Sequence, residues 1–406
     1  MKSSARTVRF ALASILGAAT LGGAVVVACG PSGFPDDNII SSVRILASRS
    51  DQPYANPGPT GVTVRSEVLA IDGRPDASGN EPMRVFWLPF VCINPPNDAF
   101  YACFAEFEAY ASSVQQYGAT GVSGQSSTSG TSATISGAIS AWDGGPEAGV
   151  GPSVGLGVGG DGGLGLEGGL AAIPAGTDLS PFLVQGAKAV FHLPADIVSA
   201  HPPVKGATQY GLAIIFNIAC AGHVELIPLD PTNPNPEQIP FGCFNSQHQQ
   251  LTASDYVIGY TEVFAYASLT NKNPVISSFS YRGQALGIDG GVTAPLSVQP
   301  CASNGNNCPD GSTTIVGVPD ASWELDPQDP GPDGGSLGEQ VWVDYYSSIG
   351  TLTEDAILIF DPVEGRVVPH SQESFQTSGS GSGTMWAVVH DNRGGASWIS
   401  VPVHSQ

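Results

Sequence analysis

Three strings in this sequence match catalytic motifs in residue type and spacing. G-x-S-x-G, the pattern of a serine nucleophile on a sharp strand-to-helix turn, occurs at residues 151–155 and again at 334–338. G-x-G-x-x-G, which binds phosphate between a strand and a helix, occurs at 163–168. The first and third strings lie in a glycine-rich tract, and 334–338 lies between a Pro/Asp loop and the run VWVDYY. These contexts predict loops and not active sites.

The adjacent pair His390 and Asp391 could act as a general base and its orienting acid only if the fold placed a serine opposite. A histidine that ends a strand beside a turn is the simpler interpretation. Because no nucleophile, acid/base pair or metal cluster lies in a suitable context, we expect that the chain is not an enzyme.

Four aspartates lie in Gly- and Pro-rich loops near the C-terminal end, namely Asp310, Asp326, Asp329 and Asp333. Carboxylates are the ligands that Ca²⁺ prefers, but the spacing matches no EF-hand, and aspartate is also a common turn former. Calcium binding is therefore the alternative to a set of exposed turn residues. The seven histidines show no paired ligand spacing, so we predict neither a zinc site nor a cofactor.

Tryptophans provide a second route to ligand binding, because an exposed row of rings could stack on a sugar. Their alternating positions in strand-like runs instead favour places in the core or between sheets. The tryptophans in question are Trp87, Trp323, Trp342, Trp386 and Trp398.

Six cysteines fall into three close couples with turn-forming residues between the members. An even set of thiols would form disulfides if the chain is exported, and the Cys-x-x-Cys spacing of metal sites is absent. Each bridge would close a short loop and stabilise the fold by roughly 2.5–3.5 kcal/mol. The predicted pairs are Cys92–Cys103, Cys220–Cys243 and Cys301–Cys308.

The N-terminal segment has the three parts of an export signal. Lys2, Arg6 and Arg9 provide the positive part, residues 10–27 are apolar, and Ala28 is the small residue before the cleavage position. An uncleaved transmembrane helix is the alternative, since about 17–25 apolar residues span a bilayer. The glycines in this stretch weaken that helix.

The run VVAC that ends at Cys29 resembles the lipobox of bacterial lipoprotein precursors. This resemblance implies a signal peptide over residues 1–28, acylation of Cys29 with palmitate-type chains, and a tether over 29–38. Gly30 follows the cysteine where an aspartate would retain a lipoprotein at the inner membrane, so the resemblance implies the outer membrane of the cell envelope.

Removing residues 1–28 leaves 11 basic and 36 acidic residues, a formal charge of −25. Nucleic acid is therefore not an expected partner. The 52 glycines, 33 prolines and many β-branched and aromatic residues favour strands joined by turns.

Alternating and continuous apolar runs predict an all-β protein with two β-sandwich domains. The first covers residues 39–270, with a mobile Gly- and Ser-rich insertion over about 118–176 and a short helix over 104–117. The second covers 271–406. The predicted strands are 40–47, 62–71, 83–92, 187–193, 210–220, 256–267, 275–281, 313–325, 340–346, 356–360, 384–391 and 397–403.

The final run WAVVHDNRGGASWISVPV resembles bacterial immunoglobulin-like and PKD-like modules. With the linker NKNPVIS, and with Trp87 before the couple Cys92 and Cys103, the chain as a whole resembles uncharacterised lipoproteins of high-GC Gram-negative bacteria. The resemblance implies two immunoglobulin-like sandwiches at the cell envelope. We therefore expect a lipid-anchored protein with a structural or protein-interaction role, or alternatively one that binds glycan or calcium.

Overall fold

β-Strands make up nearly all of the regular structure in the computed structural model, and α3 (Ile197–Ala200) is the one α-helix whose bounds are described. The chain is described over residues 38–75, 81–104, 176–227, 239–281, 284–287, 295–301, 313–317, 320–330, 335–354, 356–368 and 372–406. In these ranges no helix has the length and apolar character to cross a bilayer. The predicted signal peptide lies outside the described residues. Nearly all of the predicted tether, of the predicted helix over 104–117 and of the predicted insertion also lies outside them. The described residues are mainly β, as predicted.

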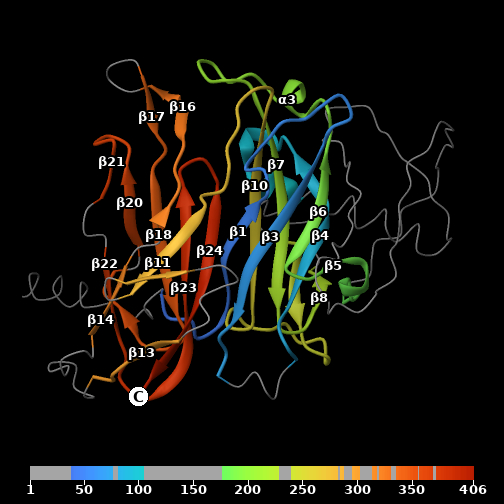
Figure 1. The fold of residues 1–406 in the computed structure, drawn as a ribbon. Helices are drawn as coiled ribbons and strands as arrows, with labels where there is room; N and C mark the ends of the chain where they lie inside the picture. Colours follow the sequence, from blue (N-terminus) through green and yellow to red (C-terminus); the bar gives the residue numbers. More distant parts are fainter. Residues whose placement is uncertain are drawn as a thin grey trace, which may run out of the picture. The chain divides into compact units, whose positions relative to one another are not determined.

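The strand with the most continuous apolar sequence lies at the centre of a five-stranded sheet (Figure 1). The order of this sheet is β2 (Tyr54–Ala55), β10 (Tyr256–Tyr266), β7 (Tyr210–Cys220), β4 (Arg84–Ile93) and β5 (Val184–Gln185). Every residue of β7 after Tyr210 is buried, which explains the run GLAIIFNIAC, because a strand covered on both faces has no polar side. Pro89 lies where the register between β4 and β7 shifts, as expected for a residue without an N–H group to pair.

A three-stranded sheet faces this one across a hydrophobic core. Its order is β1 (Val43–Ser50), β3 (Val62–Asp72) and β6 (Lys188–Leu193). Apolar side chains of β3 and β6 alternate with polar ones and meet Trp87 and Ala213 of the larger sheet. Trp87 packs on Phe191 and donates its indole N–H to the carbonyl oxygen of Gly186 at 2.8 Å. The buried tryptophan thus links both sheets.

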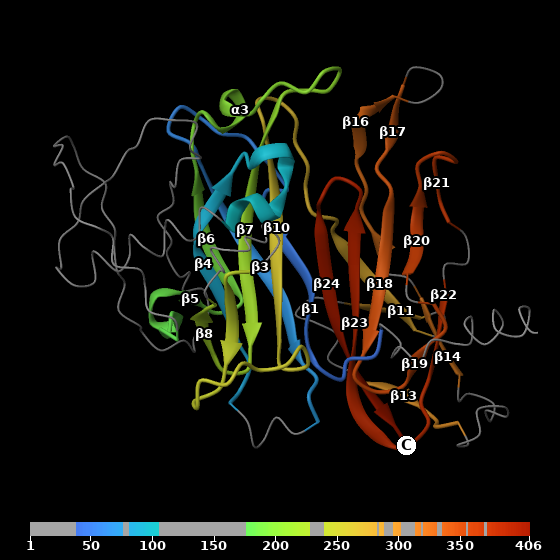
Figure 2. The same cartoon turned by 180° about the vertical axis from the view of Figure 1, so that it is seen from behind.

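The opposite face of the five-stranded sheet carries a second core, which is covered by a hairpin and by 3-10 turns (Figure 2). The hairpin consists of β8 (His223–Leu226) and β9 (Phe241–Phe244), and the turns are η1 (Pro96–Asp98), η2 (Phe100–Ala102) and η3 (Ser180–Phe182). Two disulfides are part of this layer, Cys92–Cys103 and Cys220–Cys243, and both are predicted pairs. Cys301 is disulfide-bonded, while Cys308 lies outside the described residues, so that pairing stays a prediction.

Two six-stranded sheets follow in the C-terminal part of the chain, and a third core lies between them. One contains β12 (Gln284–Gly287), β11 (Ile276–Tyr281), β14 (Thr313–Gly317), β22 (Gln372–Gln376), β19 (Thr351–Leu352) and β15 (Asp320–Ala321). The other has the order β13 (Leu296–Val298), β24 (Ala396–Ser405), β23 (Gly381–Asp391), β18 (Val341–Ser347), β20 (Ala356–Asp361) and β21 (Arg366–Val367). A separate hairpin pairs β16 (Leu325–Pro330) with β17 (Ser336–Gly338).

The predicted turn between the last two strands is present, and Gly394 takes the positive φ of +86° that favours glycine there. Residues Asn38–Gln406 form one compact unit. A fourth cluster in this unit joins Leu46 of β1 to Trp386 and Val388 of β23. Beside it, the Arg49 guanidinium lies 4.1 Å from the centre of the Trp398 ring.

Candidate functional site

In the part of the chain that the structure describes, the residues of the catalytic motifs are not arranged as those motifs require. Ser336 lies in β17, which pairs with β16, so it is not on a strand-to-helix turn. His390 Nε2 lies 3.2 Å from Asp344 Oδ2, whereas Asp391 accepts the backbone N–H groups of Arg393 and Gly395. His390 and Asp391 therefore bind different partners. Cys29 and the strings at 151–155 and 163–168 lie outside the described residues.

The predicted calcium ligands do not form a cluster in the described residues. Asp326 is buried, with Oδ1 3.9 Å from Nε of Arg393, while Asp329 is exposed. Asp310 and Asp333 lie outside the described residues. The Asp326 carboxylate thus lies beside the guanidinium of Arg393.

The tryptophans occupy different environments and form no common row. Trp87 and Trp386 are buried, and Trp398 lies under Arg49. Trp342 stacks on His390, and Trp323, at 42% exposure, stacks on Phe360 with ring centres 4.1 Å apart. These contacts favour packing roles.

Arg393 is the centre of a buried charged cluster. Its Nη1 donates to the carbonyl oxygen of Leu325 at 3.2 Å and lies 3.4 Å from Oε2 of Glu339, and its Nη2 donates to the carbonyl oxygen of Thr270. The guanidinium also lies 4.9 Å from the ring centre of Tyr54. Arg393 thereby connects the chain around Thr270 to two hairpins.

The carboxylates of this cluster are perturbed by burial. Burial, followed by the negative charge of Asp391, raises the pKa of Glu339 to about 7, against the opposing effects of the Glu324 backbone N–H and Arg393. Burial also raises the pKa of Asp391, although the backbone N–H groups of Gly395 and Arg393 oppose the shift. One guanidinium therefore serves several buried carboxyl groups, an arrangement suited to holding the hairpins in place.

A second polar cluster lies where the chain leaves β4. Asp98 Oδ2 accepts the Tyr210 hydroxyl at 2.5 Å, and Asp98 Oδ1 lies 2.8 Å from His201 Nε2. Burial, and then the Asp98 carboxylate, raises the pKa of Tyr210 to about 12. Asn97 and Asp98 both have a positive φ, near +58° and +56°, a region that these residue types tolerate. The cluster fixes this turn onto β7.

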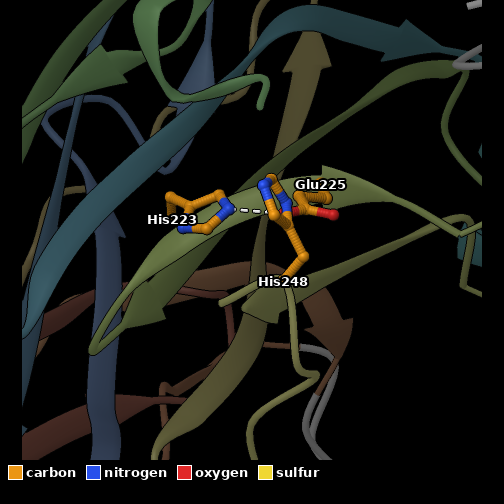
Figure 3. Close-up of side chains that lie close together, drawn as sticks. All are labelled: His223, Glu225 and His248. Carbon is orange, nitrogen blue, oxygen red and sulfur yellow. Dashed lines mark hydrogen bonds and ion pairs between the residues drawn. The ribbon is translucent and has the colours of Figure 1, made fainter. Parts of the chain in front are cut away.

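The third cluster combines side chains that commonly bind metals, and Figure 3 shows them turned toward one another. His223 and Glu225 lie two residues apart on β8, so they share one face of the strand. Glu225 Oε1 lies 2.5 Å from His223 Nε2 and 2.6 Å from His248 Nδ1. The Glu225 side chain is 2% exposed and that of His248 is 64% exposed, so the cluster reaches from the interior to the surface.

Ligand spacing in the sequence did not reveal this cluster, because His248 follows His223 by 25 residues and approaches it only through the β8–β9 hairpin. The available signal was His-x-Glu at strand spacing beside a predicted disulfide.

Neither a scan against protein-family models nor a search of curated protein sequences finds a match to this chain.

Proposed function

We propose that this chain is an exported, lipid-anchored protein of the cell envelope with a structural or protein-interaction role and no catalytic activity. The observation that carries the proposal is the pair of buried disulfides, Cys92–Cys103 and Cys220–Cys243, in a chain whose VVAC run ends at Cys29. Structural disulfides form and persist in oxidising compartments, which fits export. Acyl chains on Cys29 would then hold the folded part at a membrane, since about 0.8 kcal/mol is gained for each buried methylene.

The fold is consistent with a rigid envelope protein built from two immunoglobulin-like sandwiches, over residues 39–270 and 271–406. Each part contains two facing sheets with a core between them, the architecture of a β-sandwich. The Arg393 cluster and the contact between β1 and β23 would hold the two sandwiches together.

Two polar clusters in the described residues, those of Asp98 and Arg393, favour a role other than catalysis. Asp98, His201 and Tyr210 bind one another, and the Arg393 guanidinium is engaged by backbone carbonyl groups and carboxylates. A catalytic group needs a free position for a reacting atom, and these groups are occupied by structural contacts.

Metabolic labelling with an alkyne analogue of palmitate, followed by membrane fractionation, tests the proposal. The wild-type chain and the control Ser32→Ala should carry label and sediment with the outer membrane of a Gram-negative host. Cys29→Ala should lose the label and leave the lipid-anchored fraction. A Cys29→Ala chain that retains both label and location would contradict the anchor, and reduced thiols at the four cysteines of the described bridges would contradict export.

A further inference from the structure

We propose that His223, Glu225 and His248 bind a divalent transition metal ion, Zn²⁺ foremost, with a further coordination position open to solvent. The inference does not depend on the lipid anchor. It rests on the convergence of two imidazole nitrogens and one carboxylate oxygen, all within 4.8 Å of one another.

The three ligand atoms already lie close to coordination distance from a common point. Zinc bonds of about 2.0–2.1 Å in tetrahedral geometry separate neighbouring ligand atoms by roughly 3.3 Å. The two contacts to Glu225 Oε1 are 2.5 and 2.6 Å, so each nitrogen must withdraw by less than about 1 Å to admit the ion. His248 is largely exposed and can make this adjustment by side-chain rotation.

The donor set selects the class of ion. Two imidazoles with one carboxylate suit zinc and neighbouring transition metals, whereas Ca²⁺ and Mg²⁺ require mostly oxygen ligands. Three protein ligands leave a tetrahedral ion with one position for water or another molecule. Since Glu225 is buried and His248 is exposed, that position would face the His248 side of the cluster.

Burial of Glu225 provides an independent argument. A carboxylate withdrawn from water is destabilising unless a positive charge and hydrogen bonds compensate it. In the described part of the chain, the ion-pair contacts of Glu225 are both to histidine ring nitrogens, which are themselves metal-ligand atoms. A divalent ion between these three side chains would supply the compensating charge.

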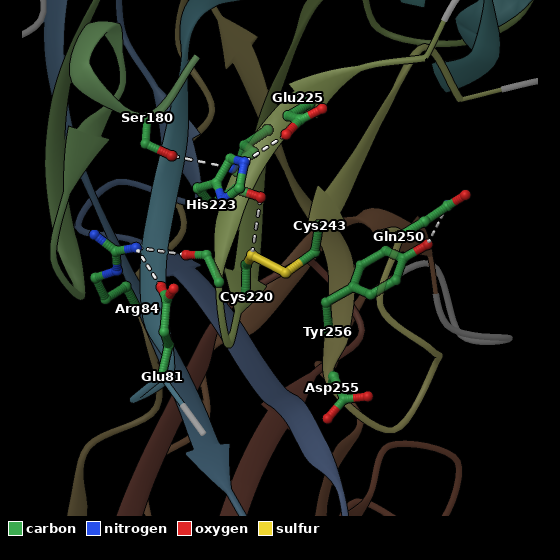
Figure 4. Close-up of a disulfide and its surroundings, with 12 residues drawn as sticks. Glu81, Arg84, Ser180, Cys220, His223, Glu225, Cys243, Gln250, Asp255 and Tyr256 are labelled. Carbon is green, nitrogen blue, oxygen red and sulfur yellow. Dashed lines mark hydrogen bonds and ion pairs between the residues drawn. A yellow bond between two sulfur atoms is a disulfide. The ribbon is translucent and has the colours of Figure 1, made fainter. Parts of the chain in front are cut away.

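The backbone that carries His223 and Glu225 is held in place by a disulfide and a hydrogen bond (Figure 4). The Cys220–Cys243 bridge ties the start of the hairpin, and the Val224 N–H donates to Ser180 Oγ at 2.9 Å. His248 has φ near +59° in a turn where Asn245 Oδ1 accepts the N–H groups of residues 247 and 249. Ordered ligands lose less entropy on binding, which favours affinity.

Zinc titration of the disulfide-bonded full chain, purified in detergent without a polyhistidine tag, tests the site. We expect one Zn²⁺ ion per chain by competition with a chromophoric chelator. His248→Ala should weaken zinc binding by at least about 100-fold. Removing a residue that only supports a metal ligand already weakens binding by up to about 100-fold, and His248 would be a ligand itself. Co²⁺ provides a second readout, since its absorption spectrum should change between the wild type and His248→Ala.

Two further variants complete the design. Glu225→Gln removes the buried ligand charge and should weaken zinc binding, while His404→Ala removes a surface histidine far along the chain and should bind zinc as the wild type does. Zinc should also raise the thermal midpoint of the wild type and of His404→Ala, but not that of His248→Ala. No zinc binding by the wild type, or equal binding by His248→Ala, would overturn the proposal. Equal binding would mean that the ion is held elsewhere on the acidic chain.

Discussion

Replacement of Glu339 by glutamine should change how stability depends on pH. The Glu339 side chain is 1% exposed, and burial with the charge of Asp391 raises its pKa from 4.5 to about 7. A carboxyl group whose pKa is higher in the folded state binds its proton more tightly there. Its stabilising contribution is therefore complete below pH 4.5 and is lost as the pH rises through 7. Glutamine keeps an oxygen to accept the Glu324 N–H group but does not ionise.

The size of the effect follows from the shift. A change of 2.5 pKa units at about 1.4 kcal/mol for each unit gives roughly 3 kcal/mol. The wild type should lose about this much free energy of unfolding relative to Glu339→Gln between pH 4.5 and 8. Comparing the two proteins at each pH removes the contributions of all other titrating groups that they share.

Urea unfolding followed by tryptophan fluorescence at pH 4.5, 6 and 8 measures the difference. Glu364→Gln, which changes an exposed carboxylate, is the matched control. If the difference between Glu339→Gln and the wild type stays constant over this range, the pKa of Glu339 is the same in the folded and unfolded states. If the variant instead becomes less stable relative to the wild type as the pH rises, the ion pair with Arg393 outweighs burial.

Two further predictions concern stability. Arg393→Ala leaves buried carboxylates without their guanidinium and should lower the free energy of unfolding by about 3–5 kcal/mol. The exposed control Arg65→Ala should change it by less than about 1 kcal/mol. Equal losses for the two variants in urea unfolding would show that the buried cluster does not depend on Arg393. Removal of the Cys220–Cys243 bridge by paired alanines should cost about 3 kcal/mol, because the bridge closes a loop with a sequence separation of 23. An unchanged urea midpoint in the double variant would contradict this entropic account.

The long strands were predictable from the sequence, whereas many short ones were not, and the predicted strand 313–325 is divided between β14, β15 and the start of β16. The runs at 210–220 and 256–267 correspond to β7 and β10 within one residue. Long apolar runs rich in β-branched residues and bounded by turn signals are typical of buried strands. The β8–β9 hairpin was missed, since four-residue strands such as HVEL have too few positions to show a period. The hairpin matters for the proposed metal site because it carries His223 and Glu225.

Side-chain environments were less predictable than strands. Asp326 was interpreted as a loop residue or a calcium ligand, but its carboxylate lies beside Arg393, which is 67 residues further along the chain. The burial of Glu225 depends on β8 packing near Ser180, a contact between segments 44 residues apart. Such neighbours are determined by tertiary packing, and local sequence patterns do not encode them.

The central place of β7 also constrains how the chain can fold. One of its hydrogen-bonding partners, β4, is synthesised more than a hundred residues earlier, and the other, β10, is synthesised later. Pairings between such distant segments form slowly, because the entropy cost of closing the intervening loop precedes the gain from the contacts. Until β10 arrives, the run GLAIIFNIAC has a bare edge of the kind that recruits other chains into aggregates. Nascent fragments that end before Tyr256 would therefore depend on a chaperone to remain unassociated.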